Sequence, residues 1–178
     1  MHKSSFNFFC YIDKLETTLI NKLPKTTSVI YRNYKEDLNV NTILKIKKAC
    51  KKRRLKFYLS NNIKLAIKLN LDGAYFPSFN KDLTFNSYSL KKNFELLGSA
   101  HNLREIRLKE SQNINHIFIS PLFSSQKNKK CLGIYKFLKL KNNSKKKIIC
   151  LGGINSKNLR MTNFLKCDGV ASISLFKE

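Results

Sequence analysis

The sequence predicts a single α/β domain that folds as a short (β/α)8 barrel of the TIM type. Short β-rich apolar runs alternate with amphipathic stretches along the chain, a pattern typical of parallel strands joined by helices. Eight such runs occur, and right-handed connections allow eight parallel strands to close into a barrel. The 178 residues suffice for one buried core, so residues 1–178 are expected to form one domain. An open doubly wound sheet is the alternative.

The first half of the chain contains four expected strands, each bounded by a turn or helix signal. The strands are residues 8–12, 28–31, 56–59 and 73–76, and the helices between them are residues 15–23, 42–53 and 63–69. Pro24 closes the first helix and Pro77 stops the fourth strand, because proline interrupts both kinds of element. Asn41 is expected to cap the helix 42–53, whose apolar residues recur at helical spacing.

The second half repeats the pattern with four more strands. The strands are residues 94–97, 116–119, 147–151 and 169–173, and the helices are residues 103–110, 135–140 and 157–166. Residues 78–92 are polar and weakly periodic, which predicts a loop with a weak helix, and residues 124–130 form a basic loop. Ser156 is expected to cap the helix 157–166.

Little sequence follows the eighth strand, so the last helix of the barrel is predicted to be largely missing. Residues 175–178 are too few for the helix that normally covers this strand, and typical barrels reach ~250 residues. The apolar surface left open could be covered by a second copy of the chain, which makes a homodimer one expected assembly.

The composition limits the partners and the compartment. The formal net charge of +24 could serve nucleic-acid binding. However, the lysines are distributed over the whole chain, and the sequence contains no known nucleic-acid-binding motif. Nucleic acid is therefore not an expected partner, whereas small anionic ligands are. No apolar run reaches the ~20 residues of a membrane span, no signal peptide is evident, and the five cysteines form no CxxC pair. These features predict a cytoplasmic protein with free thiols and no membrane contact.

The strongest local motif is a pair of segments near the end of the chain. Residues 150–156 (CLGGINS) lead a strand through two glycines into a helix start, and residues 168–174 (DGVASIS) end a strand in small residues. Glycines let the backbone approach a ligand closely, and free backbone N–H groups can bind an anion. Barrels of this type often bind phosphate after strands seven and eight. The residues expected to bind it are Gly152, Gly153, Ile173 and Ser174.

Seven short segments, taken in order, resemble the thiamine-phosphate synthase/TenI family. They are VIYR at residues 29–32, SNNIKLA at 60–66, LDGAY at 71–75, LGSAH at 97–101, ISPLF at 119–123, LGGI at 151–154 and CDGV at 167–170. The likeness extends from Phe9 to Leu175. The order and spacing of the segments are specific to the family rather than to one of its activities.

The resemblance implies a role in thiamine biosynthesis with phosphorylated small-molecule substrates. Synthases of the family join a hydroxymethylpyrimidine diphosphate to a thiazole phosphate and release pyrophosphate, with Mg2+ as the helper. Metal and cations there hold the charge that develops on the departing pyrophosphate. Members of the TenI branch instead tautomerise a thiazole precursor without the metal.

Matched position by position, the resemblance assigns roles to residues of this chain. Arg32 matches an arginine that grips the diphosphate or the pyrimidine, and Ser99 matches a serine near the departing pyrophosphate. Ser125 falls at a threonine that orients the thiazole phosphate. The lysine expected in the same loop is absent, and Lys127 or Lys129 could replace its charge.

The positions expected to bind the metal differ from the family pattern. Ser60 and Asn61 stand where the synthase has an asparagine–aspartate pair, Asn80 stands at its second aspartate, and Ile30 replaces a glutamine. Mg2+ needs one or two carboxylates besides substrate phosphates. Asp82 could supply one after a loop shift, so Asn80 and Asp82 are the candidate metal ligands, and Asn61 is a candidate for substrate binding.

Two functions therefore stay open. One is an active synthase with a degenerate metal site, and the other is a divergent TenI-like isomerase or a binder of a phosphorylated small molecule. The catalytic histidine of the TenI branch aligns with Pro121. His101, at the end of the fifth strand, could act as a base instead, or it could simply cap the following helix.

Overall fold

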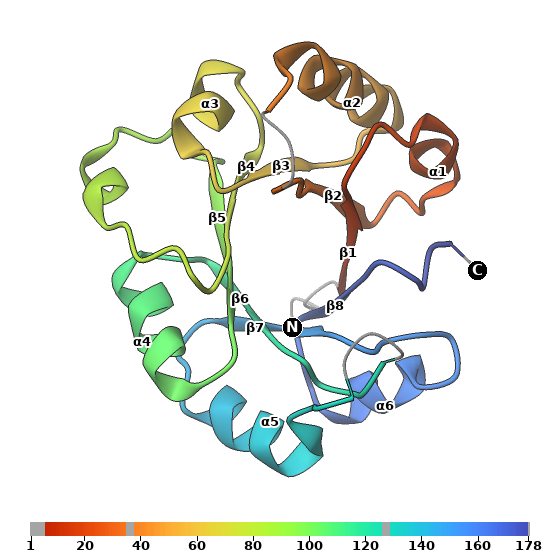
Figure 1. Cartoon of the computed structure of the whole chain (residues 1–178), viewed down its shortest axis with the longest axis vertical. Helices are drawn as coiled ribbons and strands as arrows, with labels where there is room; N and C mark the ends of the chain where they lie inside the picture. Colours follow the sequence, from red (N-terminus) through yellow and green to blue (C-terminus); the bar gives the residue numbers. More distant parts are fainter. Residues whose placement is uncertain (1–5, 35–37, 126–128, 178) are drawn as a thin grey trace.

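The computed structural model describes residues 6–34, 38–125 and 129–177. Within them eight parallel strands pair in sequence order and β8 pairs with β1, which closes the barrel (Figure 1). The strands are β1 (Asn7–Ile12), β2 (Thr27–Tyr31), β3 (Phe57–Ser60), β4 (Gly73–Phe76), β5 (Glu95–Ala100), β6 (His116–Ile119), β7 (Lys147–Leu151) and β8 (Gly169–Ser172). The predicted (β/α)8 barrel is confirmed, and the closed sheet excludes the open doubly wound alternative.

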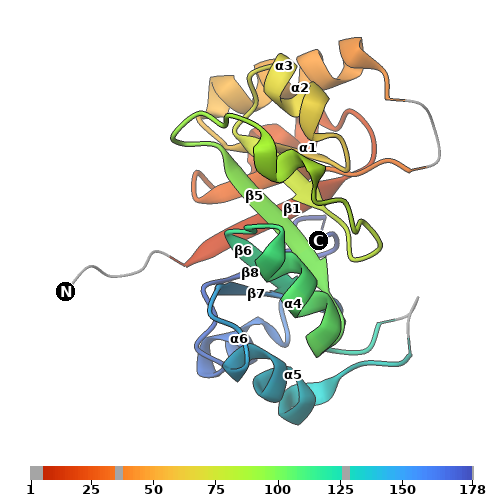
Figure 2. The ribbon, with the colours of Figure 1, turned by 90° about the vertical axis from the view of Figure 1, so that its left-hand side faces the viewer.

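The helices form an outer ring around the strands (Figure 1). They are α1 (Thr17–Lys22), α2 (Val40–Arg53), α3 (Ile63–Lys68), α4 (Leu103–Ser111), α5 (Gly133–Asn142) and α6 (Leu159–Phe164). The connection from β4 to β5 carries only the short 3-10 helix η1 (Thr84–Ser87), which is the weak helix expected between residues 78 and 92. Figure 2 shows α1, α2 and α3 grouped at one end of the molecule and α4, α5 and α6 at the other.

Alternating strand residues divide the core into an interior cluster and a layer beneath the helices. The interior cluster consists of Phe9, Tyr11, Ile30, Tyr58, Tyr75, Leu97, Phe118, Ile149 and Ala171. Its rings pack edge to face, with 4.9 Å between the centroids of Phe9 and Phe118 and 5.6 Å between those of Tyr11 and Tyr75. Because these side chains fill the barrel, a ligand has to bind at one of its ends.

Two predicted helix caps are wrong. The side chain of Asn39, not Asn41, accepts a hydrogen bond from the Thr42 backbone N–H at 3.1 Å, because α2 begins at Val40. Ser156 caps no helix, since α6 begins only at Leu159. Asn155 instead accepts hydrogen bonds from the backbone N–H groups of residues 157 and 158, and this local turn delays the helix.

Three strand ends also differ from the prediction: β3 ends at Ser60 rather than at residue 59, and the other two, those of β5 and β8, lie near the expected site. β5 continues to Ala100 because Ser99 and Ala100 pair with the end of β6, so Ser99 lies within the sheet rather than after it. β8 stops at Ser172, which leaves Ile173 outside the ladder. Backbone pairing across the sheet decides both boundaries, and local sequence does not encode that pairing.

As predicted, no helix follows β8 in the described part of the chain. Residues 173–177 form bends and turns rather than a helix, and the ammonium group of Lys177 lies 3.0 Å from the Glu16 carboxylate next to α1. The homodimer expected from this feature stays a prediction. No helix in the described ranges is long and apolar enough to cross a membrane.

Candidate functional site

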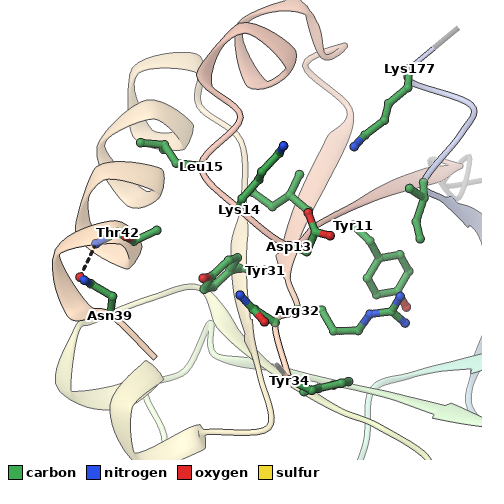
Figure 3. Close-up of a pocket in the computed structure, with 13 residues that line it drawn as sticks. Tyr11, Asp13, Lys14, Leu15, Tyr31, Arg32, Tyr34, Asn39, Thr42 and Lys177 are labelled. Carbon is green, nitrogen blue, oxygen red and sulfur yellow. Dashed lines mark hydrogen bonds between the residues drawn. The ribbon is translucent and has the colours of Figure 1, made fainter. Parts of the chain in front are cut away.

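A pocket of about 940 Å³ opens at the carboxyl ends of β1 and β2 (Figure 3). The loops after these strands and the segment after β8 form its walls. The residues important for its chemistry are Tyr11, Lys14, Arg32, Tyr34, Ile173 and Lys177. Active sites of these barrels lie at the carboxyl ends of the strands, so this pocket is the natural place for a ligand.

Arg32 lies at the mouth of the barrel and lines the pocket, and its contact with a substrate stays a prediction. Its backbone N–H donates to the Ile12 carbonyl at 2.8 Å, which fixes the chain just beyond β2. Its guanidinium carbon lies 4.7 Å from the centre of the Tyr11 ring. This cation–π contact holds the positive charge over the filled interior of the barrel and beside the pocket.

Buried hydroxyl groups lie below Arg32. Burial raises the pKa of Tyr11 and of Tyr75, and the nearby Ser99 hydroxyl acts in the opposite direction on the pKa of Tyr75. Ser99 is buried near the carboxyl end of β5, and the role expected for it stays a prediction. The Tyr11 hydroxyl is buried without a hydrogen-bond partner of normal geometry among the described residues.

The two glycines after β7 are held against the loop after β6. Gly152 and Gly153 have φ angles of 94° and 67°, in the region that glycine adopts most readily. A Cβ atom at Gly153 would lie 2.4 Å from the Phe123 carbonyl oxygen and 2.6 Å from that of Ser124. Close backbone packing therefore requires glycine here, in addition to any contact with a ligand.

Serine side chains join the loops after β7 and β8. The Ser172 hydroxyl donates to the Ile154 carbonyl at 2.9 Å and accepts from the Leu175 backbone N–H at 3.1 Å. No described residue accepts a hydrogen bond from the backbone N–H of Gly153, Ile173 or Ser174. We call Gly152, Gly153, Ile173 and Ser174 the phosphate cradle. Its free N–H groups have the character that an anion site needs.

The two amides at the expected metal positions are bonded to each other. The Asn80 side-chain amide donates to the Asn61 side-chain oxygen at 2.8 Å. The Asn80 side-chain oxygen in turn accepts from the Asp82 backbone N–H at 2.9 Å. The structure thus brings Asn61 and Asn80 together, but each amide oxygen already accepts a hydrogen bond.

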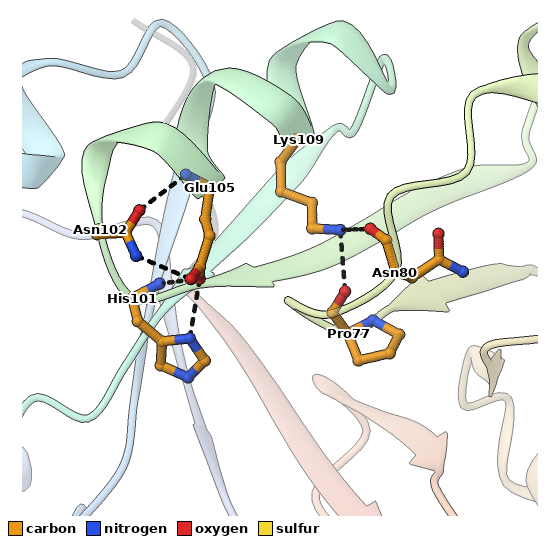
Figure 4. Close-up of polar contacts among 6 residues, drawn as sticks. All are labelled: Pro77, Asn80, His101, Asn102, Glu105 and Lys109. Atoms are coloured by element: carbon orange, nitrogen blue, oxygen red, sulfur yellow. Dashed lines mark hydrogen bonds and ion pairs between the residues drawn. The ribbon is translucent and has the colours of Figure 1, made fainter.

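The loop after β4 is anchored by two buried polar side chains of α4. The Lys109 ammonium group is fully buried and donates to the carbonyl oxygens of Pro77 and Asn80, each at 2.9 Å (Figure 4). It also donates to the side chain of Gln112, whose amide nitrogen donates to the Asp82 carbonyl at 2.7 Å. The Asp82 carboxylate accepts from the Thr84 backbone N–H, and this bond lowers its pKa.

These contacts give a donor set that does not fit Mg2+. The ion prefers carboxylate oxygens, whereas Asn61 and Asn80 offer amide oxygens. The Asp82 carboxylate accepts the Thr84 backbone N–H at the start of η1. Across the described ranges, no three or more His, Cys, Asp or Glu side chains gather into a metal site. Metal binding by Asn80 and Asp82 stays a prediction.

His101 lies at the start of α4, in the arrangement of a helix cap (Figure 4). Its ring Nδ1 lies 2.9 Å from the Glu105 carboxylate, and its backbone N–H donates to the same group at 2.8 Å. Asn102 completes the cap by accepting from the Glu105 backbone N–H at 2.9 Å. The capping interpretation accounts for these contacts, and a role for His101 as a base stays a prediction.

The remaining candidates lie in the loop after β6. Ser125 and Lys129 are exposed in the described parts of this loop. Lys127 lies outside the described residues. The roles expected for all three therefore stay predictions.

Sequence reasoning missed three residues that shape this end of the barrel. Tyr11 was assigned only to a strand, Tyr34 was not singled out, and Lys109 was placed on a helix without a role. The Tyr34 hydroxyl lies 2.7 Å from the Ser60 hydroxyl, and burial raises the pKa of Tyr34 to about 12. The i,i+3 spacing of Lys109 and Gln112 was the one sequence signal that could have suggested a shared polar contact.

Comparison with known proteins agrees with this architecture. The sequence matches the family described as thiamine monophosphate synthase over residues 11–176. The thiamine-phosphate synthase of Prochlorococcus marinus (strain AS9601) is 28% identical over 138 residues, which cover 76% of this chain and 38% of that protein. That of Lactococcus lactis subsp. cremoris (strain MG1363) is 24% identical over 152 residues, which cover 84% and 69%. The chain thus spans between 38% and 69% of the length of these relatives.

Solved structures show the same fold. Thiamine phosphate pyrophosphorylase from Pyrococcus furiosus superposes with a TM-score of 0.78 at 16% identity, covering 98% of this chain and 91% of that one. The enzyme of the same name from Bacteroides thetaiotaomicron gives 0.59 at 13% identity, covering 96% and 84%. At these identities the likeness concerns the fold alone. The family match over nearly the whole sequence establishes that the chain belongs to the thiamine monophosphate synthase family.

Proposed function

We propose that this chain binds a thiazole phosphate in the phosphate cradle and joins to it a hydroxymethylpyrimidine supplied as the diphosphate. In this reaction the thiazole nitrogen forms a bond to the pyrimidine methylene carbon while the bond from that carbon to the pyrophosphate oxygen breaks. The observation that carries the proposal is the set of N–H groups at Gly153, Ile173 and Ser174, for which the described part of the chain offers no acceptor. Family membership supplies the reaction class.

The second substrate fits the pocket that adjoins the cradle. Ile173 belongs to both, so a ligand in the pocket lies next to a phosphate in the cradle. Arg32 carries a positive charge at the mouth of the barrel, where charge develops on the departing pyrophosphate. Ser99 supplies a hydroxyl on the same side of the interior.

Synthesis of thiamine phosphate tests the proposal directly. Purified protein is incubated with both substrates, with Mg2+ or with EDTA, and the product is quantified. Arg32→Ala should lower kcat/KM by roughly 100-fold or more, because a charge that stabilises the transition state is lost. Ser99→Ala should lower it by about 10-fold, the loss expected for one hydrogen bond.

The matched control is Arg104→Ala, which removes an exposed arginine on α4 remote from the pocket. It should retain activity within about two-fold of the unsubstituted protein, since distant surface charges are screened. If Arg32→Ala and Arg104→Ala show equal rates, Arg32 has no part in the reaction. If the unsubstituted protein makes no product under either condition, the synthase proposal is wrong.

A second candidate function is favoured by one observation, the hydrogen bond between Asn61 and Asn80. A site without metal-binding carboxylates suits a binder of a phosphorylated thiazole, or a TenI-like isomerase, because neither needs Mg2+. Absence of product together with thermal stabilisation by thiazole phosphate would support this alternative. Loss of that thermal stabilisation in a variant of the phosphate cradle would show that thiazole phosphate binds there.

A further inference from the structure

The pocket beside β1 and β2 gathers three basic side chains from different parts of the chain. Lys14 follows β1, Arg32 follows β2, and Lys177 comes from the segment after β8 (Figure 3). Asp13 is the one acidic residue among the described residues that line the pocket. Lys177 pairs with Glu16, but this ion pair is partly exposed and such pairs contribute little, so an anionic ligand can compete for the lysine.

The floor of the pocket carries an unsatisfied polar group. Tyr11 is 2% exposed, and its hydroxyl has no hydrogen-bond partner of normal geometry among the described residues. The Tyr75 hydroxyl interacts with it, and a buried hydroxyl without a well-formed hydrogen bond can take a further partner. The N-terminus of the 14-residue helix α2 also lines the pocket through Asn39 and Thr42, and its positive end favours anions.

The opposite corner of the barrel mouth, where a metal would be expected, is occupied by the protein itself. Asn61 and Asn80 share a hydrogen bond of 2.8 Å. Above them, the Tyr34 hydroxyl bonds to Ser60, and the Tyr34 ring packs edge to face on Phe79 with centroids 5.5 Å apart. Side-chain contacts thus bridge the loops after β2 and β4 across the end of β3.

We propose that the pocket lined by Lys14, Arg32 and Lys177 is a diphosphate site that works without a divalent cation. Protein cations take the place of the metal: the guanidinium of Arg32 offers a planar fork of donors, and the two lysines offer point charges. The assignment of this diphosphate to a pyrimidine substrate rests on the proposed function. Binding of a diphosphate group to the pocket does not depend on it.

Calorimetric titration with inorganic pyrophosphate tests the site at about 150 mM salt, where remote charges are screened. The unsubstituted protein should bind pyrophosphate in EDTA, with no requirement for added Mg2+. The double variant Lys14→Ala/Lys177→Ala should bind at least about ten-fold more weakly, because two charge-assisted contacts are lost.

Two controls separate this site from other anion-binding surfaces. Lys51→Ala/Lys52→Ala removes two exposed charges from the far end of α2 and should leave the affinity within about two-fold. Arg104→Ala removes an exposed charge on α4, which does not line the pocket, and should also retain pyrophosphate binding. If pyrophosphate binding requires Mg2+, or survives the Lys14→Ala/Lys177→Ala change, the proposed site is wrong. A chain that binds pyrophosphate as expected but makes no thiamine phosphate would contradict only the proposed function.

Discussion

Gly153→Ala is expected to destabilise the fold by about 3 kcal/mol and to abolish measurable binding of thiazole phosphate in the cradle. Alanine at a φ of 67° costs roughly 1–2 kcal/mol. The added Cβ would also lie 2.4 Å from the Phe123 carbonyl oxygen, and relieving such overlap costs about 1–3 kcal/mol. The loop after β7 has to move away from the loop after β6, and the N–H group of residue 153 moves with it.

Gly133→Ala provides a closely matched control for backbone strain. Gly133 has a φ of 69°, and a Cβ built there has no neighbour within 4 Å. This variant should therefore lose only about 1 kcal/mol and keep its binding of thiazole phosphate. Urea unfolding and calorimetric titration measure the two effects. Equal losses of stability in the two variants would show that contact with the loop after β6 does not determine the choice of glycine at 153.

The architecture could be predicted because the strand pattern is local. Each strand is a short run of apolar residues, and the turn signals between runs reveal the repeating unit. The misplaced caps and strand ends depend on contacts across the sheet, such as the pairing of Ser99 with Phe118 that extends β5.

The candidate site was only partly predictable for the same reason. The phosphate cradle lies in two consecutive strand–loop segments, and its position in the barrel follows from strand order. The corner of the barrel mouth where a metal was expected is closed by two hydrogen bonds between distant residues. Asn61 and Asn80 are 19 positions apart, and Tyr34 and Ser60 are 26 positions apart. A sequence shows that the carboxylates are absent, but it does not show that the amides which replace them bond to each other.

The sequence pattern around Lys109 does not reveal the role of this residue. A lysine on an amphipathic helix normally lies in solvent, and burial of its ammonium group is costly unless the group is fully hydrogen-bonded. Here the charge is compensated by two carbonyl oxygens and the Gln112 side chain. The fixed loop therefore depends on a charge buried outside the pocket.

The contribution of Lys109 to the stability of the protein is expected to rise with pH between about 8 and 10.5, against the opposite contribution of buried thiols and phenols such as Cys10 and Tyr11, whose pKa burial raises. Burial lowers the pKa of this lysine from 10.5 to about 8. In that interval the unfolded chain binds more protons at this position than the folded chain does, so raising the pH favours the folded state. The contribution is about 3 kcal/mol across the interval, and it is lost as the pH falls through 8.

Comparison with Lys109→Met isolates this contribution, because methionine has a similar length and does not titrate. The unfolding free energy of the unsubstituted protein minus that of the variant should increase by about 3 kcal/mol from pH 8 to pH 10.5, as measured by urea unfolding. Other titrating groups are shared by both proteins and cancel in this difference. Parallel pH profiles for the two proteins would contradict the expected titration of Lys109.

The same variant should loosen the loop that carries Asn80. Without the ammonium donor, the carbonyl oxygen of Pro77 keeps only the Asn80 backbone N–H and that of Asn80 keeps the Gln112 amide, so local opening of the loop becomes easier. Amide hydrogen exchange in residues 78–82 should accelerate about ten-fold, whereas Lys68→Met, an exposed change on α3, should leave it unaltered. Unchanged exchange in Lys109→Met would mean that the backbone turn and Gln112 hold the loop without Lys109. Faster exchange would show that the hydrogen bonds of Lys109 on α4 hold the loop that carries Asn80 in place.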